Sequence, residues 1–195
     1  MGDLHRTKEL LITAPTIEPV TIEELAAHCR ISGHDDDEYL RSLITAARMH
    51  LEKVCWSAFI TQTWQYWWDR FWWKMFLPRP PLQTLSWIKY VPPGGGALVT
   101  LPTSLYELSA ENECNYVRAQ YLQTYPITRG YRDDVTAQVI VGYGSTAASV
   151  PLPIRHAIKL LAAHLYLNRG DGPPEQLPPA IDMLIQNYRF KELTP

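Results

Sequence analysis

The sequence has almost no excess charge and no long hydrophobic run. Its 195 residues carry 18 Lys and Arg against 20 Asp and Glu, which gives a net charge of −2. A protein that coats DNA phosphates is strongly basic, so this balance argues against that class. No run approaches the roughly 18 consecutive apolar residues that a membrane-spanning helix needs. The opening MGDLHRTKE also lacks the apolar core of a secretion signal, so we expect a cytoplasmic protein.

Cysteine is scarce, and the common catalytic motifs are missing. Cys29, Cys55 and Cys114 stand apart without any C-x-x-C pair, which predicts neither a zinc site nor a disulfide framework. No H-E-x-x-H occurs, and Gly94–Gly96 lacks the Lys of a phosphate-binding loop. Asp35–Glu38 could hold a divalent cation, but its place at the start of a helix already explains it. We therefore predict no catalytic residue, no metal and no cofactor.

An enzyme whose site is assembled from scattered residues remains the alternative. Such a site would combine His164 with Glu107 or Asp182. It would require a deep polar pocket that holds titratable groups with shifted pKa values. His164 falls within the apolar stripe of its predicted helix, which favours a histidine of the core or of a subunit interface. We predict that the protein is not an enzyme.

Aromatic residues are abundant instead. The chain has 7 Trp and 11 Tyr, and many aromatic residues gather between Trp64 and Trp73. They could stack on nucleic-acid bases, but only Arg70 and Lys74 are interleaved with them. The same charges interrupt a surface that could lie on a membrane. We favour strands that contribute to a core or to a protein–protein interface.

Helical periodicity marks the N-terminal part of the chain. Residues 1–19 read as extended, because two prolines exclude a long helix. A capping box at Thr21–Glu24 opens a helix that runs to about Arg30. The next helix, about Asp37–Val54, has one apolar stripe at helical spacing. The stripe contains Leu40, Leu43, Ile44, Ala47, Leu51 and Val54.

The middle of the chain changes to a period of two, which predicts strands. The Gly-rich residues 92–96 join two of these strands in a hairpin, and residues 110–134 read as mostly irregular. The last strand, Val135–Val141, places Val135, Ala137, Val139 and Val141 on one side. The predicted strands are residues 60–68, 75–77, 84–91, 97–101, 106–108, 116–118 and 135–141.

Two helices follow the strands. The helix Pro153–Asn168 is expected to pack on Asp37–Val54, with Arg155 and Lys159 on its opposite, polar side. Its packing residues are Ile154, Ala157, Ile158, Leu161 and Leu165. The last helix, about Ala180–Arg189, is short and follows a proline-rich linker. Because it cannot bury an apolar stripe alone, we favour docking on a partner, with packing on its own bundle as the alternative.

The order of these elements predicts an α+β fold. We expect a small helical bundle, with two N-terminal and one or two C-terminal helices, that is interrupted by a large and mainly antiparallel β insertion. Residues 1–58 form the N-terminal half of the helical domain, and residues 59–149 form the β-rich insertion. Residues 150–195 form the C-terminal half, which carries a partner-docking tail.

Short segments in a particular order and spacing extend over nearly the whole chain. They are Pro19–Glu24, His28–Ile31, Asp35–Asp37, Leu43–Arg48, Leu51–Glu52, Thr61–Trp64, Leu77–Leu82, Ile88–Tyr90, Tyr106–Leu108, Val141–Gly144, Val150–Ile158 and Leu165–Arg169. Together they resemble the tailed-bacteriophage head–tail connector family, the head-completion adaptors. The run Trp67–Trp73 and the segment 110–134 depart from the family pattern.

The resemblance implies a non-enzymatic structural protein of the phage neck. Family members form rings, typically of twelve copies, that bind the portal protein on one face and a stopper or tail-completion protein on the other. Genomic DNA passes through the lumen without sequence-specific binding. The expected location is the virion, preceded by the host cytoplasm before assembly. Another neck or tail-completion protein of the virion is the alternative.

Two sets of residues are predicted to carry these contacts. In the family the C-terminal segment is the usual portal-docking piece. A ring also needs a heterologous subunit interface, with a different patch on each side. The predicted portal-docking residues are Ile181, Leu184, Ile185 and Tyr188, and the predicted interface residues are Trp67, Trp68, Trp72, Trp73, Arg155 and Lys159.

Overall fold

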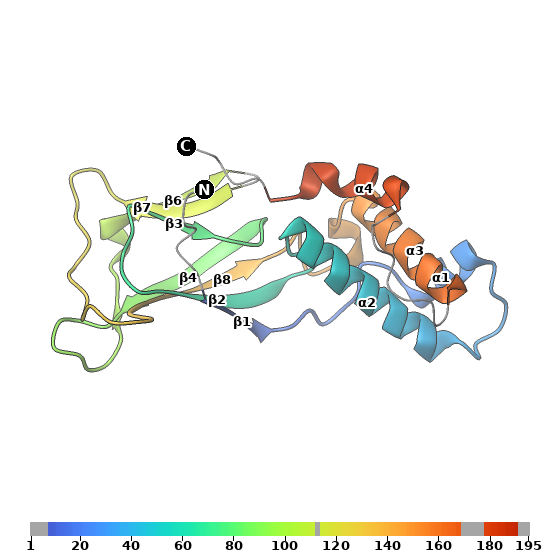
Figure 1. Cartoon of the computed structure of the whole chain (residues 1–195), viewed down its shortest axis with the longest axis horizontal. Helices are drawn as coiled ribbons and strands as arrows, with labels where there is room; N and C mark the ends of the chain where they lie inside the picture. The colour runs from blue at the N-terminus through green and yellow to red at the C-terminus, as the bar shows by residue number, and fades with distance from the viewer. Residues whose placement is uncertain (1–7, 112–113, 169–177, 191–195) are drawn as a thin grey trace. The chain divides into compact units, whose positions relative to one another are not determined.

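The protein is described by a computed structural model that covers residues 8–111, 114–168 and 178–190. These residues divide into two compact units. A helical unit contains Pro15–Ile60 and Tyr143–Phe190, and a β unit contains the described residues of Met1–Ala14 and of Thr61–Gly142. The predicted α+β class is therefore confirmed, with antiparallel sheets and helices in one chain. Figure 1 shows the elements of both units.

The helical unit is built on two long helices that lie side by side (Figure 1). The predicted capping box starts the first helix: Thr21 Oγ1 accepts the amide of Glu24, and the Glu24 carboxylate accepts the amide of Thr21, both at 3.2 Å. The α-helices are α1 (Ile22–Cys29), α2 (Asp37–Cys55), α3 (Leu152–Leu167) and α4 (Pro179–Ile185). A 3₁₀ turn, η3 (Gln186–Tyr188), follows α4. The last predicted helix therefore ends earlier than Arg189.

The predicted stripes of α2 and α3 form the core of the helical unit. Leu40, Ile44, Ala47 and Leu51 of α2 are buried in one cluster with the corresponding residues of α3. Those residues are Ile154, Ala157, Ile158 and Leu161, with Leu165 partly buried against them. Apolar side chains at helical spacing meet in this way because burying one stripe against another removes both from water.

The β unit contains a five-stranded antiparallel sheet with β8 at its centre, between β2 and β4 (Figure 1). Val135, Ala137, Val139 and Val141 of β8 are all buried, as their alternation predicts. In sheet order the strands are β1 (Lys8–Thr13), β2 (Gln62–Trp68), β8 (Val135–Val141), β4 (Leu82–Tyr90) and β5 (Val99–Thr100).

A second, three-stranded sheet completes the β unit. It has the order β3 (Lys74–Leu77), β7 (Cys114–Ala119) and β6 (Tyr106–Glu111). Met75, Leu77 and Val117 of this sheet are fully buried. The Tyr66 hydroxyl of the larger sheet donates to the carbonyl of Pro78, just after β3, at 2.9 Å. This hydrogen bond connects the larger sheet to the segment that follows β3.

The first strand differs from the expectation. Residues 8–13 were grouped with the helical half of the chain, but they pair with β2 as an edge strand of the larger sheet. Extended sequence without a helical period does not reveal which strand it will pair with, because pairing is decided by distant residues. The 169–177 linker lies outside the described residues. In the part of the chain that the structure describes, no helix combines the length and hydrophobicity that a bilayer crossing requires.

Candidate interaction surfaces

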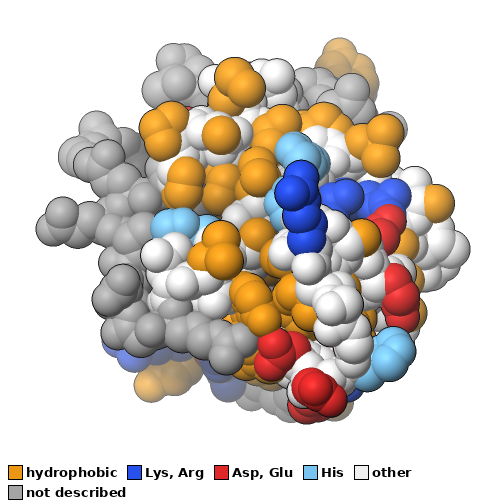
Figure 2. Space-filling view, turned by 90° about the vertical axis from the view of Figure 1, so that its right-hand side faces the viewer, with side chains coloured by type: hydrophobic (Ala, Val, Ile, Leu, Met, Phe, Trp, Pro, Cys, Tyr) orange, Lys and Arg blue, Asp and Glu red, His pale blue; other side chains and the backbone are white. Residues whose placement is uncertain are grey.

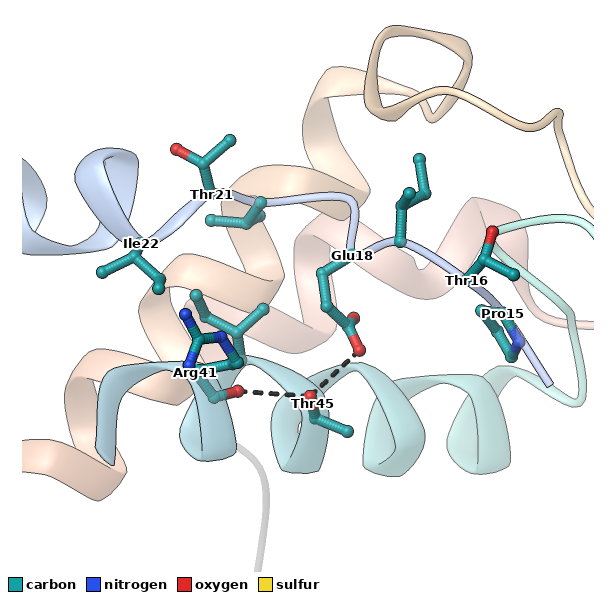
Figure 3. A pocket seen from close by; sticks show the side chains of 10 residues that line it. Pro15, Thr16, Glu18, Thr21, Ile22, Arg41 and Thr45 are labelled. Carbon is teal, nitrogen blue, oxygen red and sulfur yellow. Dashed lines mark hydrogen bonds between the residues drawn. The ribbon is translucent and has the colours of Figure 1, made fainter. Parts of the chain in front are cut away.

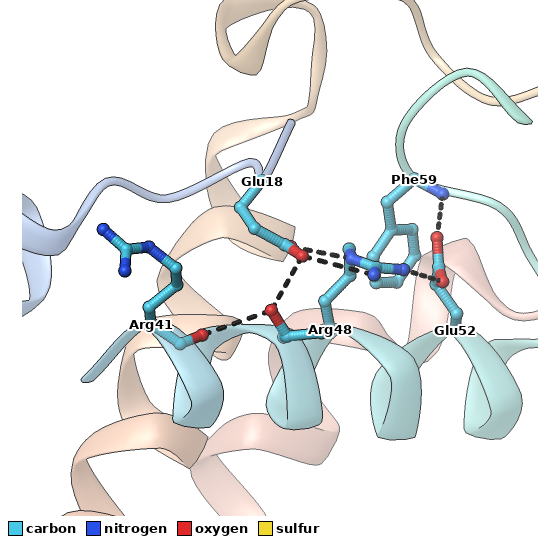
Figure 4. Close-up of polar contacts among 6 residues, drawn as sticks. Glu18, Arg41, Arg48, Glu52 and Phe59 are labelled. Atoms are coloured by element: carbon cyan, nitrogen blue, oxygen red, sulfur yellow. Dashed lines mark hydrogen bonds and ion pairs between the residues drawn. The ribbon is translucent and has the colours of Figure 1, made fainter. Parts of the chain in front are cut away.

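A buried ion-pair network organises the helical unit on one side of α2 (Figure 4). Arg48 Nε lies 2.7 Å from Glu18 Oε2, and Arg48 Nη1 lies 2.7 Å from Glu52 Oε2. The other oxygen of Glu52 accepts the backbone amide of Phe59 at 2.8 Å. Arg48 and Glu52 are each only 6% exposed. Spacing of four residues places them on the same helix face, so one arginine links two carboxylates.

This network fixes the segments where the chain enters and leaves the helical unit. Glu18 follows the entry at Pro15, and Phe59 precedes the exit after Ile60. Burial alone would lower the pKa of Arg48, but its hydrogen bonds and attraction to Glu18 and Glu52 outweigh burial and raise that pKa. The arginine therefore stays charged, and its role is structural.

A pocket beside this network has a volume of about 380 Å³ (Figure 3). Its carboxylate, Glu18, already binds Arg48 and accepts a hydrogen bond from Thr45 Oγ1 at 3.0 Å. Its arginine, Arg41, pairs with Glu38. The remaining lining residues are Pro15, Thr16, Ile17, Val20, Thr21, Ile22 and Ile44. No general base or nucleophile is free among them, which leaves the pocket without evident chemistry.

The residues of the alternative enzyme site are each engaged locally. His164 Nδ1 lies 3.2 Å from Asn168 Nδ2. Asp182 pairs with Arg189, and Glu107 pairs with Arg118. Within the described residues, no three His, Cys, Asp or Glu side chains come together in a way that could hold a metal ion. The structure therefore offers this alternative no support.

The apolar stripe of the C-terminal helix packs on the chain's own bundle, which is the alternative that the sequence left open. Ile181 and Ile185 are buried in the core of the chain's own helical unit, and Leu184 and Tyr188 are partly buried against it. Two hydrogen bonds strengthen this attachment. The Phe190 amide donates to the Cys55 carbonyl at 2.7 Å, and Ser57 Oγ donates to the Tyr188 carbonyl at 2.9 Å. A short helix gains this burial within its own subunit because α3 lies next to it.

Three of the four predicted interface tryptophans are at least partly covered within the β unit. Trp68 is 4% exposed and belongs to the core of the subunit, which leaves little of its side chain for an interface. Trp67 lies under the Lys8 ammonium, 5.0 Å from the ring centre, and Trp72 lies under the Arg70 guanidinium at 4.0 Å. Trp73 alone of the four is largely open, at 74% exposed.

Arg155 is also used within the subunit. Its Nε donates to the Pro19 carbonyl at 2.9 Å, and its Nη2 lies 2.5 Å from the Glu24 carboxylate. These bonds fasten α3 to the start of α1, so Arg155 is not free for a neighbouring subunit as expected. Lys159, one turn further along α3, is half-buried.

Two loops of the β unit form an exposed aromatic surface that was not predicted from the sequence. Phe71 of the 69–73 loop stacks on Tyr125 of the 119–132 loop with ring centres 4.5 Å apart. Hollows of about 460 and 430 Å³ are lined by residues of these two loops, the first with Trp73 and Tyr121 and the second with Trp72 and Tyr131. The large apolar side chains that project here are Trp73, Tyr121, Leu122, Ile127 and Tyr131.

Sequence reasoning also missed an exposed edge of the larger sheet. Leu10, Leu11 and Ile12 of β1 are all exposed, although consecutive strand residues point to opposite faces. The helical unit likewise exposes large apolar residues, and Figure 2 shows hydrophobic side chains gathered with Lys, Arg and His on the end of this unit. The large apolar residues that the helical unit exposes include Met49, Trp56, Leu152, Leu167 and Met183. The exposure of Leu10, Leu11 and Ile12 could not be predicted from the sequence, because the run L-L-I by itself is equally typical of a core strand.

Comparison with solved structures gives matches over almost the entire chain. A chain in the neck of an empty gene transfer agent particle, computed with C6 symmetry, matches with a TM-score of 0.81 at 22% identity, covering 96% of this chain and 97% of that one. A chain in the virion of the native gene transfer agent particle matches with a TM-score of 0.77 at 23% identity, covering 95% and 97%.

A third match comes from the neck of the native particle, computed with C12 symmetry. Its TM-score is 0.71 at 21% identity, and it covers 95% of this chain and 97% of that one. No model of a protein family and no curated protein matches the chain. The chain therefore shares the complete fold of these particle components, helical unit and β unit together.

Proposed function

We propose that this protein is a structural subunit of the neck of a tailed-phage-like virion, where it forms a ring adaptor between the portal vertex and the stopper or tail. The observation that carries the proposal is the match over 96% of the chain, at a TM-score of 0.81, to a chain of a gene transfer agent neck. Necks computed with C6 and C12 symmetry contain equivalent copies around an axis. We take twelve copies as the size of the ring, with the DNA passage through its lumen.

The surface of the subunit supports an assembling protein. Large apolar side chains are open on β1, on the two loops of the β unit and on α2, α3 and α4. Where such side chains lie next to one another, as Leu10, Leu11 and Ile12 do along β1, an exposed apolar surface is typical of a protein–protein contact. The two charged side chains that line the pocket beside α2, Glu18 and Arg41, are each held in an ion pair within the subunit.

Portal docking is proposed for the C-terminal segment, with its residues in different roles from those first expected. Ile181 and Ile185 attach α4 to its own subunit. The portal then meets the side of this segment that stays open, with exposed Met183 and half-exposed Leu184 and Tyr188. A helix held in place loses less entropy on docking than a free one, which favours binding.

The test is to mix the full chain with the portal oligomer of the same particle and to image the product by negative-stain electron microscopy. We expect a closed ring with twelvefold symmetry, stacked coaxially on the portal and open at its centre. Absence of any rotationally symmetric ring, together with no binding to portal, would overturn the proposal.

The docking surface has its own test. Met183→Glu is expected to weaken portal binding more than tenfold in a co-sedimentation assay, because it places a charge in an apolar contact. Met49→Glu, at a similarly exposed methionine of α2, is the matched control and should bind as the wild type does. If both variants bind portal equally well, the proposed portal contact at α4 is contradicted.

A further inference from the structure

The two edges of the larger sheet are unequal in a way that suggests how copies join. β1 forms one edge and β5 the other, with β2, β8 and β4 between them. Among the described residues no strand pairs with the outer side of β1. Natural sheets usually protect such an edge with charges, prolines or bulges, because its free amides and carbonyls invite another strand.

The β1 edge has one irregularity, a register shift against β2 between Leu11 and Thr13, and is otherwise poorly protected. Its two charged residues are engaged within the β unit, Lys8 with Asp133 at 3.0 Å and Glu9 with Arg79 at 2.7 Å. The next three residues, Leu10, Leu11 and Ile12, are 52%, 38% and 45% exposed. Side chains on both faces of the strand are therefore open together with its edge. A strand added alongside β1 covers the edge and brings neighbouring side chains over both faces, which a helix cannot do.

The opposite edge carries a shorter apolar segment. Leu98 and Val99 are 48% and 42% exposed, and Val99–Thr100 pairs only with the end of β4. The rest of β4 is irregular, with its register to β8 shifting between Leu82 and Thr84 and again between Leu85 and Trp87. Such bulges twist an edge away from pairing, so Leu98–Thr100 is the part of this side that is suited to contact.

The positions of these two segments fit a ring. A closed ring uses a heterologous interface, in which two different patches face in different directions on each subunit. Strands lie about 4.8 Å apart in a sheet, so the four steps from β1 to β5 place the two edges roughly 19 Å apart across the strands. Along the strands, Thr100 is level with Lys8, so the two patches are also offset from one another. Two-fold pairing of β1 with another β1 would instead close a dimer and leave Leu98 and Val99 open.

We propose that β1 of each copy lies alongside Leu98–Thr100 of the next copy, so that the five-stranded sheets meet edge to edge around the ring. The occupant of the β1 edge is thus a second copy of this chain. This inference rests on the proposed ring function and assigns its subunit contact. Leu10, Leu11 and Ile12 become covered by the neighbour, which explains why the isolated subunit exposes them.

The test uses two full-length variants that each damage one edge. Leu11→Lys damages the β1 edge, and Val99→Lys damages the β5 edge. Leu122→Lys, at a residue that is 84% exposed in the 119–132 loop, is the matched control. Circular dichroism first verifies that all three fold. Association is then measured by sedimentation equilibrium, or by counting copies bound to portal if the wild type assembles only there.

We expect each edge variant to lose at least tenfold in association and to form no closed ring, while Leu122→Lys stays within threefold of wild type. The sharper result comes from mixing the two edge variants. One intact β1 edge then meets one intact β5 edge, so heterodimers form and growth stops at two copies. The head-to-tail contact is established if each variant alone stays monomeric while the mixture of the two forms the heterodimer.

Other outcomes separate the inference from the proposed function. If wild type forms rings and Leu11→Lys forms them equally well, the edge contact is refuted and the ring function stands. If Leu11→Lys alone blocks association and the mixture gives no heterodimer, β1 has a different partner and the contact is again refuted. If wild type forms no ring in isolation or on portal, the function itself fails.

Discussion

Removing the charge of Arg48 should destabilise the helical unit strongly. Arg48→Met keeps a chain of similar length but removes the guanidinium that lies between Glu18 and Glu52. The Glu52 side chain, only 9% exposed, then keeps the Phe59 amide as a partner but loses its counter-ion. Breaking a buried ion pair on one side costs about 3–5 kcal/mol, because the remaining charge is left uncompensated.

The lower end of that range applies here. The Glu18 side chain is 24% exposed, so water takes over part of the lost interaction. We therefore expect a loss of about 3 kcal/mol in the free energy of unfolding. For a chain of this size, this corresponds to a fall of roughly 6–12 °C in Tm. The assay is urea unfolding followed by circular dichroism at a helical wavelength.

Two further variants determine whether the reasoning is right. Arg48→Met combined with Glu52→Gln removes the carboxylate charge while an amide oxygen can still accept from Phe59, so at least half of the loss should be recovered. Arg41→Met breaks an exposed pair with Glu38 on the same helix and should cost less than about 1 kcal/mol. A loss below about 1 kcal/mol for Arg48→Met, or a double variant no better than the single one, would refute the buried-charge argument.

Two other outcomes are expected. Ile185→Ala should lower the free energy of unfolding by about 2–5 kcal/mol in the same assay, because Ile185 is fully buried. Met183→Ala, at an exposed residue of the same helix, should change it little. Equal effects of the two variants would contradict the attachment of α4 to the helical unit. Burial would raise the pKa of Asp134, but hydrogen bonds from the Tyr131 amide, from Arg129 and from the Gly130 amide outweigh it and lower the pKa. The contribution of Asp134 to the free energy of unfolding is therefore present above the unfolded pKa of about 4 and is lost as pH falls through the folded pKa. Asp134→Asn should be less stable than wild type at pH 7 and should lose less stability on acidification. Unfolding followed by tryptophan fluorescence at several pH values measures both effects.

The helices and the central strand could be recognised from the sequence alone because their signals are local. The capping box at Thr21–Glu24 satisfies amides only three residues away. The stripe of α2 repeats at helical spacing, and the alternation Val135–Val141 matches the period of a strand. Such patterns require only that one face of the element be buried, and any compact fold with these elements buries it.

The order and spacing of short segments also pointed to a phage connector before any contact was known. The fold match to gene transfer agent neck chains agrees with that resemblance. The interface residues could not be chosen in the same way. Trp68 and Trp73 look alike in the sequence, yet one lies in the core and the other is 74% exposed. Trp68 points inward from β2, whose register depends on pairing with distant strands, whereas Trp73 lies in the 69–73 loop that follows β2.

By itself, the sequence determined the two long helices and the central strand and which faces they bury, because those faces follow from spacing within one element. Only the tertiary structure decided which surfaces remain open. It buried Ile181 and Ile185 against the chain's own core, used Arg155 to bind Glu24, and placed Leu10, Leu11 and Ile12 at the edge of a sheet. Exposure is a property of the neighbours that a residue acquires in space, and those neighbours come from other parts of the chain, as with Arg155 and Glu24, which are 131 residues apart.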